Sequence, residues 1–193
     1  RQMCIRDSNI PGMPIGSFAV KPGPFMASFD IFNLKIIGKG GHAAMPQTTI
    51  DPIIIGTKIV DAYQSIVSRY IDPQEPVVLS VTQFHGGDAY NVIPNEIEIK
   101  GTVRCFSTKV QASIEKQMEN LTSSICSAYG ATYEFEYQHR YPPTINSAEE
   151  VETSLKVMNE ISDESMINTS PSPSMGSEDF AFMLQEKPGS YIW

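Results

Sequence analysis

The order of hydrophobic periodicities between Phe29 and Tyr141 constrains the fold more than any other feature of the chain. Alternation of apolar and polar residues, or enrichment in Val, Leu and Thr, predicts strands over residues 29–37, 76–84, 96–104 and 132–141. Apolar residues at helical spacing predict helices over residues 52–70 and 109–129. The resulting order, β-α-β-β-α-β, is that of a ferredoxin-like unit and places the chain in the α+β class.

Cap residues indicate where these helices begin and end. Asp51 followed by Pro52 predicts an N-cap and a first helical residue. Thr108 with Gln111 predicts a capping box for the second helix, and Gly130 predicts the residue that ends it.

The segments on either side of this unit are interpreted as pieces of one discontinuous α/β domain. Ser147 with Glu150 predicts a capping box before a third helix, and residues 191–193 indicate a buried strand. The division expected from these patterns is 1–26, 27–141 and 142–193. Residues 1–8 show no periodicity, so we expect them to be foreign to this fold.

Composition excludes several classes of partner. The net charge is −8 and no cluster of Lys or Arg occurs, which argues against nucleic acid and anionic membranes as partners. No apolar run approaches the roughly 20 residues that span a bilayer. The three cysteines, Cys4, Cys105 and Cys126, lack CxxC spacing, so they indicate reduced thiols in a cytoplasmic compartment.

The loop from Gly38 to Pro46 carries the first candidate site residue, His42. Its three glycines leave little side-chain bulk, so the backbone can adopt positive φ and a ligand can approach closely. Histidine in such a loop favours a ligand-facing role. The segment also matches the G-x-G-x-x-A pattern of dinucleotide sites. That interpretation fails because the helix starts about eight residues too late for the motif.

Asn91 and Arg104 join His42 as candidates, because each lies at a strand end or in a glycine-bearing loop. Together the three side chains could form one clamp. Arginine can bind a carboxylate through two hydrogen bonds, while histidine and asparagine can donate to a developing oxyanion. The alternative is an asparagine in a surface turn and an arginine on a solvated face of the sheet.

The remaining polar candidates carry weaker signals. His85 is interpreted as a hydrogen-bonded loop residue and His139 as a solvated residue at a strand end. Glu178 and Asp179 are either an acidic pair near a metal or the N-terminus of a helix capped by Ser177, and composition favours the helix. No His or Cys spacing typical of a metal site occurs, so no residue is assigned as a metal ligand.

Several motifs, in this order along the chain, resemble those of one enzyme family. They are Asn9-x-Pro11-Gly12-x-Pro14-x-Gly16, Pro22-Gly23-Pro24, Gly38-Lys39-Gly40-Gly41-His42-Ala43-Ala44-x-Pro46, Asp51-Pro52, Gly87-Asp88-Ala89-Tyr90-Asn91-Val92-Ile93-Pro94, Gly101-Thr102-Val103-Arg104 and Gly176-Ser177-Glu178-Asp179-Phe180. The chain resembles the metal-dependent amidohydrolases of the hippurate hydrolase, N-acyl-amino-acid amidohydrolase and indole-acetyl-amino-acid hydrolase group. This group belongs to the aminoacylase and carboxypeptidase superfamily.

The resemblance implies a catalytic domain with two divalent metal ions (zinc, manganese or cobalt), which would activate water. It also implies that residues 27–141 are an inserted lid, through which a homodimer forms. The residue matching His42 would reach the partner's active site and stabilise the oxyanion. Asn91 and Arg104 would bind the N-acyl amino acid, the arginine taking its carboxylate, and Gly41, Glu178 and Asp179 would lie near the site.

The departures from the family pattern are as informative as the matches. The upstream metal motifs and the general-base glutamate are absent, and Ser8 stands where a metal-binding histidine precedes the family's asparagine. We therefore expect an inactive fragment, with few or no metal ligands, of a cytoplasmic enzyme that hydrolyses N-acyl amino acids. A dipeptidase or carboxypeptidase of the same superfamily, or a non-catalytic dimerisation or binding module, remains the alternative.

Overall fold

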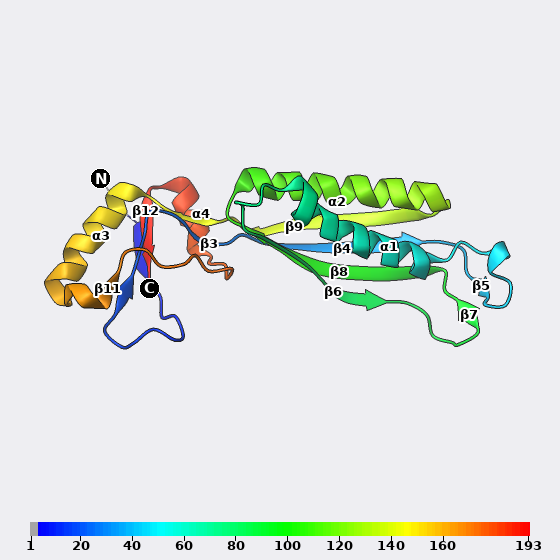
Figure 1. Cartoon of the computed structure of the whole chain (residues 1–193), viewed down its shortest axis with the longest axis horizontal. Coiled ribbons are helices and arrows are strands. Elements are labelled where there is room, and N and C mark those ends of the chain that lie inside the picture. The colour runs from blue at the N-terminus through cyan, green and yellow to red at the C-terminus, as the bar shows by residue number, and fades with distance from the viewer. Residues whose placement is uncertain (1–3) are drawn as a thin grey trace. The chain divides into compact units, whose positions relative to one another are not determined.

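A computed structural model describes residues 4–193, which form two compact units (Figure 1). The inserted unit comprises Asp30–Arg140, and the flanking unit comprises the described residues up to Phe29 together with Tyr141–Trp193. The inserted unit begins three residues after, and ends one residue before, the range of 27–141 expected from sequence.

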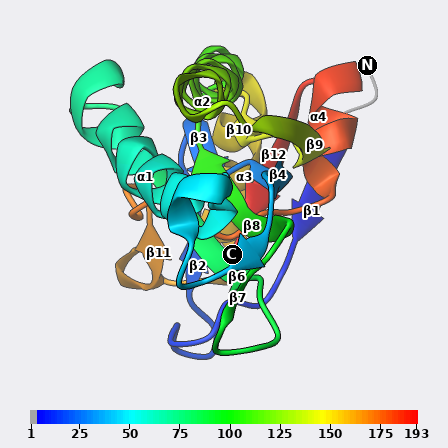
Figure 2. The same ribbon diagram turned by 90° about the vertical axis from the view of Figure 1, so that its right-hand side faces the viewer.

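The inserted unit is built on one sheet with the strand order β6-β8-β4-β9. The strands are β4 (Phe29–Ile37), β6 (Val77–His85), β8 (Glu96–Cys105) and β9 (Thr132–Tyr141). Helices α1 (Pro52–Ser65) and α2 (Thr108–Tyr129) lie side by side on one face of this sheet (Figures 1 and 2). The predicted β-α-β-β-α-β order and the α+β class are confirmed, since this strand order is the ferredoxin-like one.

Strict alternation along the central strands produces these layers. In β8, Ile97, Ile99 and Val103 are buried in the core between sheet and helices, while the residues between them face away. Strand β4 contributes Phe32, Leu34 and Ile36 to the same core. The opposite face of the sheet is polar and carries the ion pairs Lys35–Glu96 (2.8 Å) and Lys100–Glu98 (2.9 Å).

Most predicted helix ends are observed. Asp51 caps α1 by accepting a hydrogen bond from the Ile53 backbone N–H at 2.9 Å, and Gly130 ends α2 with φ of 71°. The helix predicted to run to Tyr70 does so, because α1 continues into a single π-helical turn, η2 (Ile66–Tyr70).

Two capping predictions are wrong. Ser107, not Thr108, caps α2, because its hydroxyl accepts from the Val110 backbone N–H at 3.4 Å. The Gln111 side chain cannot complete a capping box, since it is held by a buried carboxylate of the sheet, Asp30. At α3, the Ser147 hydroxyl donates to the Glu150 carboxylate instead of capping a backbone N–H.

The flanking unit combines short strand pairs with two helices, α3 (Ala148–Ile161) and α4 (Phe180–Glu186). Three pairs are formed: β1 (Cys4–Asp7) with β12 (Gly189–Ile192), β2 (Phe18–Ala19) with β11 (Ile167–Asn168), and β3 (Gly23–Met26) with β10 (Thr144–Asn146). Asn146 joins these segments, because its side chain bonds both the N–H and the C=O of Tyr191 and the carbonyl of Lys21.

Strand β1 corrects one expectation. Residues 1–8 were expected to be foreign to the fold, but Cys4–Asp7 pairs in parallel with β12. Such pairing uses backbone groups of both strands, so it needs no side-chain periodicity in a short strand. Residues 1–3 lie outside the described part of the chain.

No helix within residues 4–193 has the length and apolar character needed to cross a membrane.

Candidate functional site

The glycine–histidine loop and the Asn91 hairpin meet at one end of the inserted unit. Strand β5 (Gly41–His42) pairs antiparallel with β7 (Val92–Ile93), which places His42 opposite Val92. The Ala43 N–H also donates to the carbonyl of Asn91 at 2.9 Å. We call this end the tip (Figures 1 and 2), and the end where Asp30 and Arg140 connect to the flanking unit the base.

The glycines of the loop are required for close backbone approach, not for positive φ. None of Gly38, Gly40 and Gly41 has a positive φ, so that part of the prediction is wrong. A Cβ on Gly38 would lie 2.1 Å from the carbonyl oxygen of Ile50, and one on Gly40 would lie 2.5 Å from that of Ile93. The loop therefore lies directly against two backbone segments, which holds His42 in place.

His42 is exposed, and one of its ring nitrogens is engaged. Its Nδ1 accepts a hydrogen bond from the Ala44 backbone N–H at 3.1 Å. A neutral imidazole with Nδ1 as acceptor carries its hydrogen on Nε2. The arrangement therefore presents an N–H donor from a backbone-held loop, which is the group an oxyanion requires.

Asn91 lies at the corner of a turn beside His42. The Val92 N–H donates to the carbonyl of Ala89 at 3.4 Å, so Tyr90 and Asn91 are the two central residues of a β-turn. Both residues are exposed. The structure thus brings Asn91 and His42 together through the β5–β7 pairing, and each presents a hydrogen-bonding side chain at the tip.

Arg104 lies at the base, at the opposite end of β8. It pairs with Val78 of β6, whereas Glu96 at the start of β8 lies next to the Asn91 hairpin. Eight residues of extended strand separate the two ends by about 26 Å. One inserted unit therefore does not bring Arg104 to His42 and Asn91, so the three side chains do not form a clamp within one chain.

Sequence reasoning missed a buried polar cluster at the base. The Asp30 carboxylate is fully buried and accepts hydrogen bonds from Gln111 (2.6 Å), Tyr137 (2.9 Å) and His139 (3.2 Å). The other nitrogen of His139 lies 3.1 Å from the Glu115 carboxylate. His139 was expected to be solvated, but its half-exposed ring lies between two carboxylates.

At Asp30, burial has a larger effect on the pKa of the carboxyl than its hydrogen bonds have. Burial raises the pKa of Asp30, although the hydrogen bonds from Tyr137, Gln111 and His139 act in the opposite direction. Burial also lowers the pKa of Arg104, while the nearby Asp30 charge acts to raise it. The signal available in the sequence was the position of Asp30 on the apolar face of its strand, where a charge needs partners.

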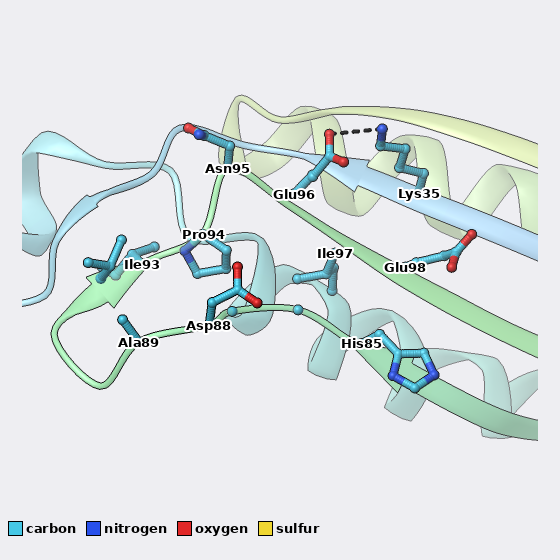
Figure 3. A pocket seen from close by; sticks show the side chains of 13 residues that line it. Lys35, His85, Asp88, Ala89, Ile93, Pro94, Asn95, Glu96, Ile97 and Glu98 are labelled. Carbon is cyan, nitrogen blue, oxygen red and sulfur yellow. Dashed lines mark ion pairs between the residues drawn. The ribbon is translucent and has the colours of Figure 1, made fainter.

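A hollow of about 930 Å³ lies between the tip and the open face of the sheet (Figure 3). It is lined by the loop that follows β6 and by polar residues of the open face, including Lys35, His85, Glu96 and Glu98. Lys35 is already paired with Glu96. We assign no ligand to this hollow, whose lining holds Asp88, Glu96 and Glu98 beside Lys35.

The acidic pair after Ser177 belongs to the flanking unit. Glu178 accepts a hydrogen bond from the Tyr191 hydroxyl at 2.6 Å, and burial together with this bond raises the pKa of Tyr191 to about 12. Asp179 forms an exposed ion pair with Arg6 at 3.3 Å. Asp179, and not Ser177, stands at the N-cap position of α4.

Metal-ligating side chains do not gather within the described part of the chain. Among residues 4–193, no group of three or more His, Cys, Asp or Glu side chains could hold a metal ion. Residues 4–193 therefore do not by themselves supply a set of ligands for a metal pair.

Comparison with known proteins points to one family. Residues 29–130, more than half of the chain, match the peptidase dimerisation domain of the M20 family. An N-acyl-L-amino acid amidohydrolase of Geobacillus stearothermophilus is 51% identical over 131 residues, which cover 68% of this chain and 35% of that protein. Thermostable carboxypeptidase 1 of Saccharolobus solfataricus is 39% identical over 181 residues, 93% of this chain and 45% of that protein.

A solved structure extends the likeness to both units. A dinuclear metal-binding peptidase of the M20 family from Bacillus subtilis matches with a TM-score of 0.80 and 28% identity, over 98% of this chain and 46% of that one. The chain spans about half the length, or less, of the curated relatives it matches.

Proposed function

Because the chain belongs to the M20 peptidase family, we propose that the whole protein hydrolyses the amide bond of N-acyl amino acids. The high identity to an N-acyl-L-amino acid amidohydrolase supports this substrate class. This chain would contribute the inserted lid and parts of the catalytic domain.

The observation that carries the proposal is the geometry of the tip. His42 holds its Nδ1 on a backbone N–H and leaves its Nε2 hydrogen for a ligand, and the exposed Asn91 lies beside it. In amide hydrolysis the carbonyl oxygen gains negative charge, and a donor already held in place stabilises that charge without reorganisation. His42 is therefore proposed as the oxyanion donor, with Asn91 and Gly41 adjacent to the substrate.

The separation between tip and base supports the proposal that two subunits share each reaction centre. Arg104 is about 26 Å from the start of the tip along β8, too far to bind the carboxylate of a substrate whose amide meets His42 of the same chain. In a homodimer formed through the inserted unit, the tip of one subunit would serve the centre to which its partner contributes Arg104. The match to a dimerisation domain supports this arrangement.

The remaining parts of the proposal concern the whole protein. Two divalent ions (zinc, manganese or cobalt) are proposed for it, since the related Bacillus subtilis peptidase is described as binding two metals. Residues 4–193 do not provide a metal site, so we assign no step to a metal held by this chain. Glu178 and Asp179 are proposed to lie near the centre. The three free cysteines support a cytoplasmic location.

The first prediction tests His42 in the full-length protein. Substitution His42→Ala is expected to lower kcat on an N-acyl amino acid about a hundredfold, the usual effect of removing one oxyanion donor. The matched control is His85→Ala, an exposed histidine at the end of β6 that is not part of the β5–β7 pair. Equal activity of His42→Ala and the control would reject the role.

A carboxypeptidase or dipeptidase activity is the second candidate, supported by the identity to a thermostable carboxypeptidase. Both reactions hydrolyse an amide next to a free carboxylate, so Arg104 would serve either one. Comparing kcat/KM for N-acetyl and N-benzoyl amino acids with kcat/KM for dipeptides of the same amino acids separates them. A purely structural dimerisation module would hydrolyse none of these substrates in its full-length form.

A further inference from the structure

The most exposed aromatic side chain among the described residues lies at the tip. Tyr90 has a relative exposure of 109%, more than the reference value for a free residue. Large aromatic side chains are usually highly buried on average, because they carry much apolar surface. Since the Tyr90 ring is fully exposed and does not contribute to the hydrophobic core, it is a candidate for a role in binding.

The backbone around Tyr90 is well held. Tyr90 and Asn91 are the two corner residues of the Ala89–Val92 turn, and Asn91 is tied to the β5 segment through the Ala43 N–H. Strand β7 begins immediately after this turn and pairs with β5. Tyr90 is thus a long side chain on a fixed backbone, which loses little conformational entropy when it meets a ligand.

Other apolar residues of the tip are also exposed. Val92, which follows Asn91, has a relative exposure of 50%, and Met45, three residues after His42, has 49%. The tip therefore combines hydrogen-bonding groups at His42 and Asn91 with apolar surface on the segments that carry them. A ligand that matches this surface has a polar group beside an apolar one.

The inference rests on the proposed function. Consecutive Cα atoms lie about 3.8 Å apart, so a ligand that meets the Asn91 side chain is within reach of the Tyr90 ring. An N-acyl amino acid has two arms around its amide, and in the proposal Arg104 takes the carboxylate arm. We propose that Tyr90 contacts the other arm, the acyl group, and determines a preference for bulky apolar acyl groups over acetyl.

The test uses the full-length protein and two substrates that differ only in the acyl group, an N-benzoyl and an N-acetyl derivative of the same amino acid. In Tyr90→Ala, the ratio of kcat/KM for benzoyl to that for acetyl is expected to fall about tenfold, as for the loss of an apolar contact in a specificity pocket. Tyr90→Phe is expected to restore the ratio. Tyr70→Ala, another exposed tyrosine of the inserted unit, is the control and should leave it unchanged.

Each outcome decides between distinct possibilities. An unchanged ratio in Tyr90→Ala would overturn the inference. Equal losses on both substrates, with a loss of the dimer in sedimentation, would also overturn it and assign Tyr90 to the subunit interface. If the unmodified protein hydrolyses neither substrate, the proposed function itself fails and the inference fails with it.

Discussion

The two ends of the inserted unit handle their polar side chains in opposite ways. At the base, Asp30 is fully buried, and its carboxylate accepts hydrogen bonds from three side chains of α2 and β9. At the tip, His42 and Asn91 are exposed, and hydrogen bonds from the backbone hold the segments that carry them. The base uses its polar groups for its own structure, while the tip leaves its polar groups available to a ligand.

This difference indicates which end of the inserted unit is suited to binding a ligand. Buried polar groups need partners, so a cluster such as Asp30 with its donors is satisfied internally and contributes to stability and specificity of packing. Exposed donors on a rigid backbone lose little conformational entropy when they bind a ligand, so they are suited to recognition. Arg104 is the exception, because it lies at the base and is nevertheless proposed to bind an external ligand, the substrate carboxylate.

The largest expected effect tests whether the two ends serve different reaction centres. His42→Ala and Arg104→Ala are each expected to be nearly inactive as full-length homodimers. A heterodimer of the two, purified with two tags, has one centre with both residues intact if His42 acts across the interface. We expect about half of the unmodified turnover per dimer, because one of two equivalent sites is complete.

The same experiment can break the comparison between tip and base. If His42 and Arg104 served the same subunit's centre, both sites of the heterodimer would carry one defect. Its activity would then stay at the level of the single variants. The matched control is a His42→Ala dimer whose two subunits carry the two different tags.

The next largest effect concerns the base. Asp30→Asn places an amide N–H toward Tyr137 or toward the Gln111 and His139 donors, because both carboxylate oxygens now accept hydrogen bonds. The free energy of unfolding at pH 7 is expected to fall by about 2 kcal/mol, the cost of a mismatched buried hydrogen-bonding group. Urea unfolding measures it, with the exposed Asp61→Asn in α1 as control. A loss no larger than that of Asp61→Asn would contradict the role of the cluster.

Much of this arrangement could be predicted from sequence, because its signals are local. Alternation predicted β4, β8 and β9, and the Asp51–Pro52 and Gly130 signals predicted ends of α1 and α2. The pairing of β5 with β7 could not be predicted, since each strand has two residues and depends on contacts between distant segments. A clamp of all three residues within one chain does not fit the length of β8, whereas the family resemblance implied that His42 acts in the partner's site.

The Asp30 cluster could not be predicted from the sequence for a related reason. Asp30 lies on the apolar face of its strand, a signal that was not used, and its partners lie on α2 and β9, about 80 and 110 residues later. Periodicity identifies which face of an element is buried, and it does not identify which polar side chains meet there. The same limit applies to Gln111, whose side chain binds Asp30 of the sheet and is not part of a capping box.

The smallest expected effect is the dependence of the Asp30→Asn loss on pH. Burial raises the pKa of Asp30 above its ordinary value of 3.8, so the folded chain binds a proton more tightly than the unfolded chain does. The stability that this carboxyl contributes is fully present below pH 3.8 and is lost as pH rises through the raised pKa. The gap in unfolding free energy between the unmodified chain and Asp30→Asn should therefore be smaller at pH 7 than near pH 4.

His139 and Glu115 are further ionisable side chains in contact with this cluster, so the comparison needs a matched background. Measuring both proteins with His139→Gln removes the histidine charge from the difference, and Glu115 remains common to both. A gap that widens from pH 4 to pH 7 would mean that the hydrogen bonds from Tyr137 and Gln111 outweigh burial. The base would then hold Asp30 as a stabilised anion, and its contrast with the tip would rest on charge as well as on burial.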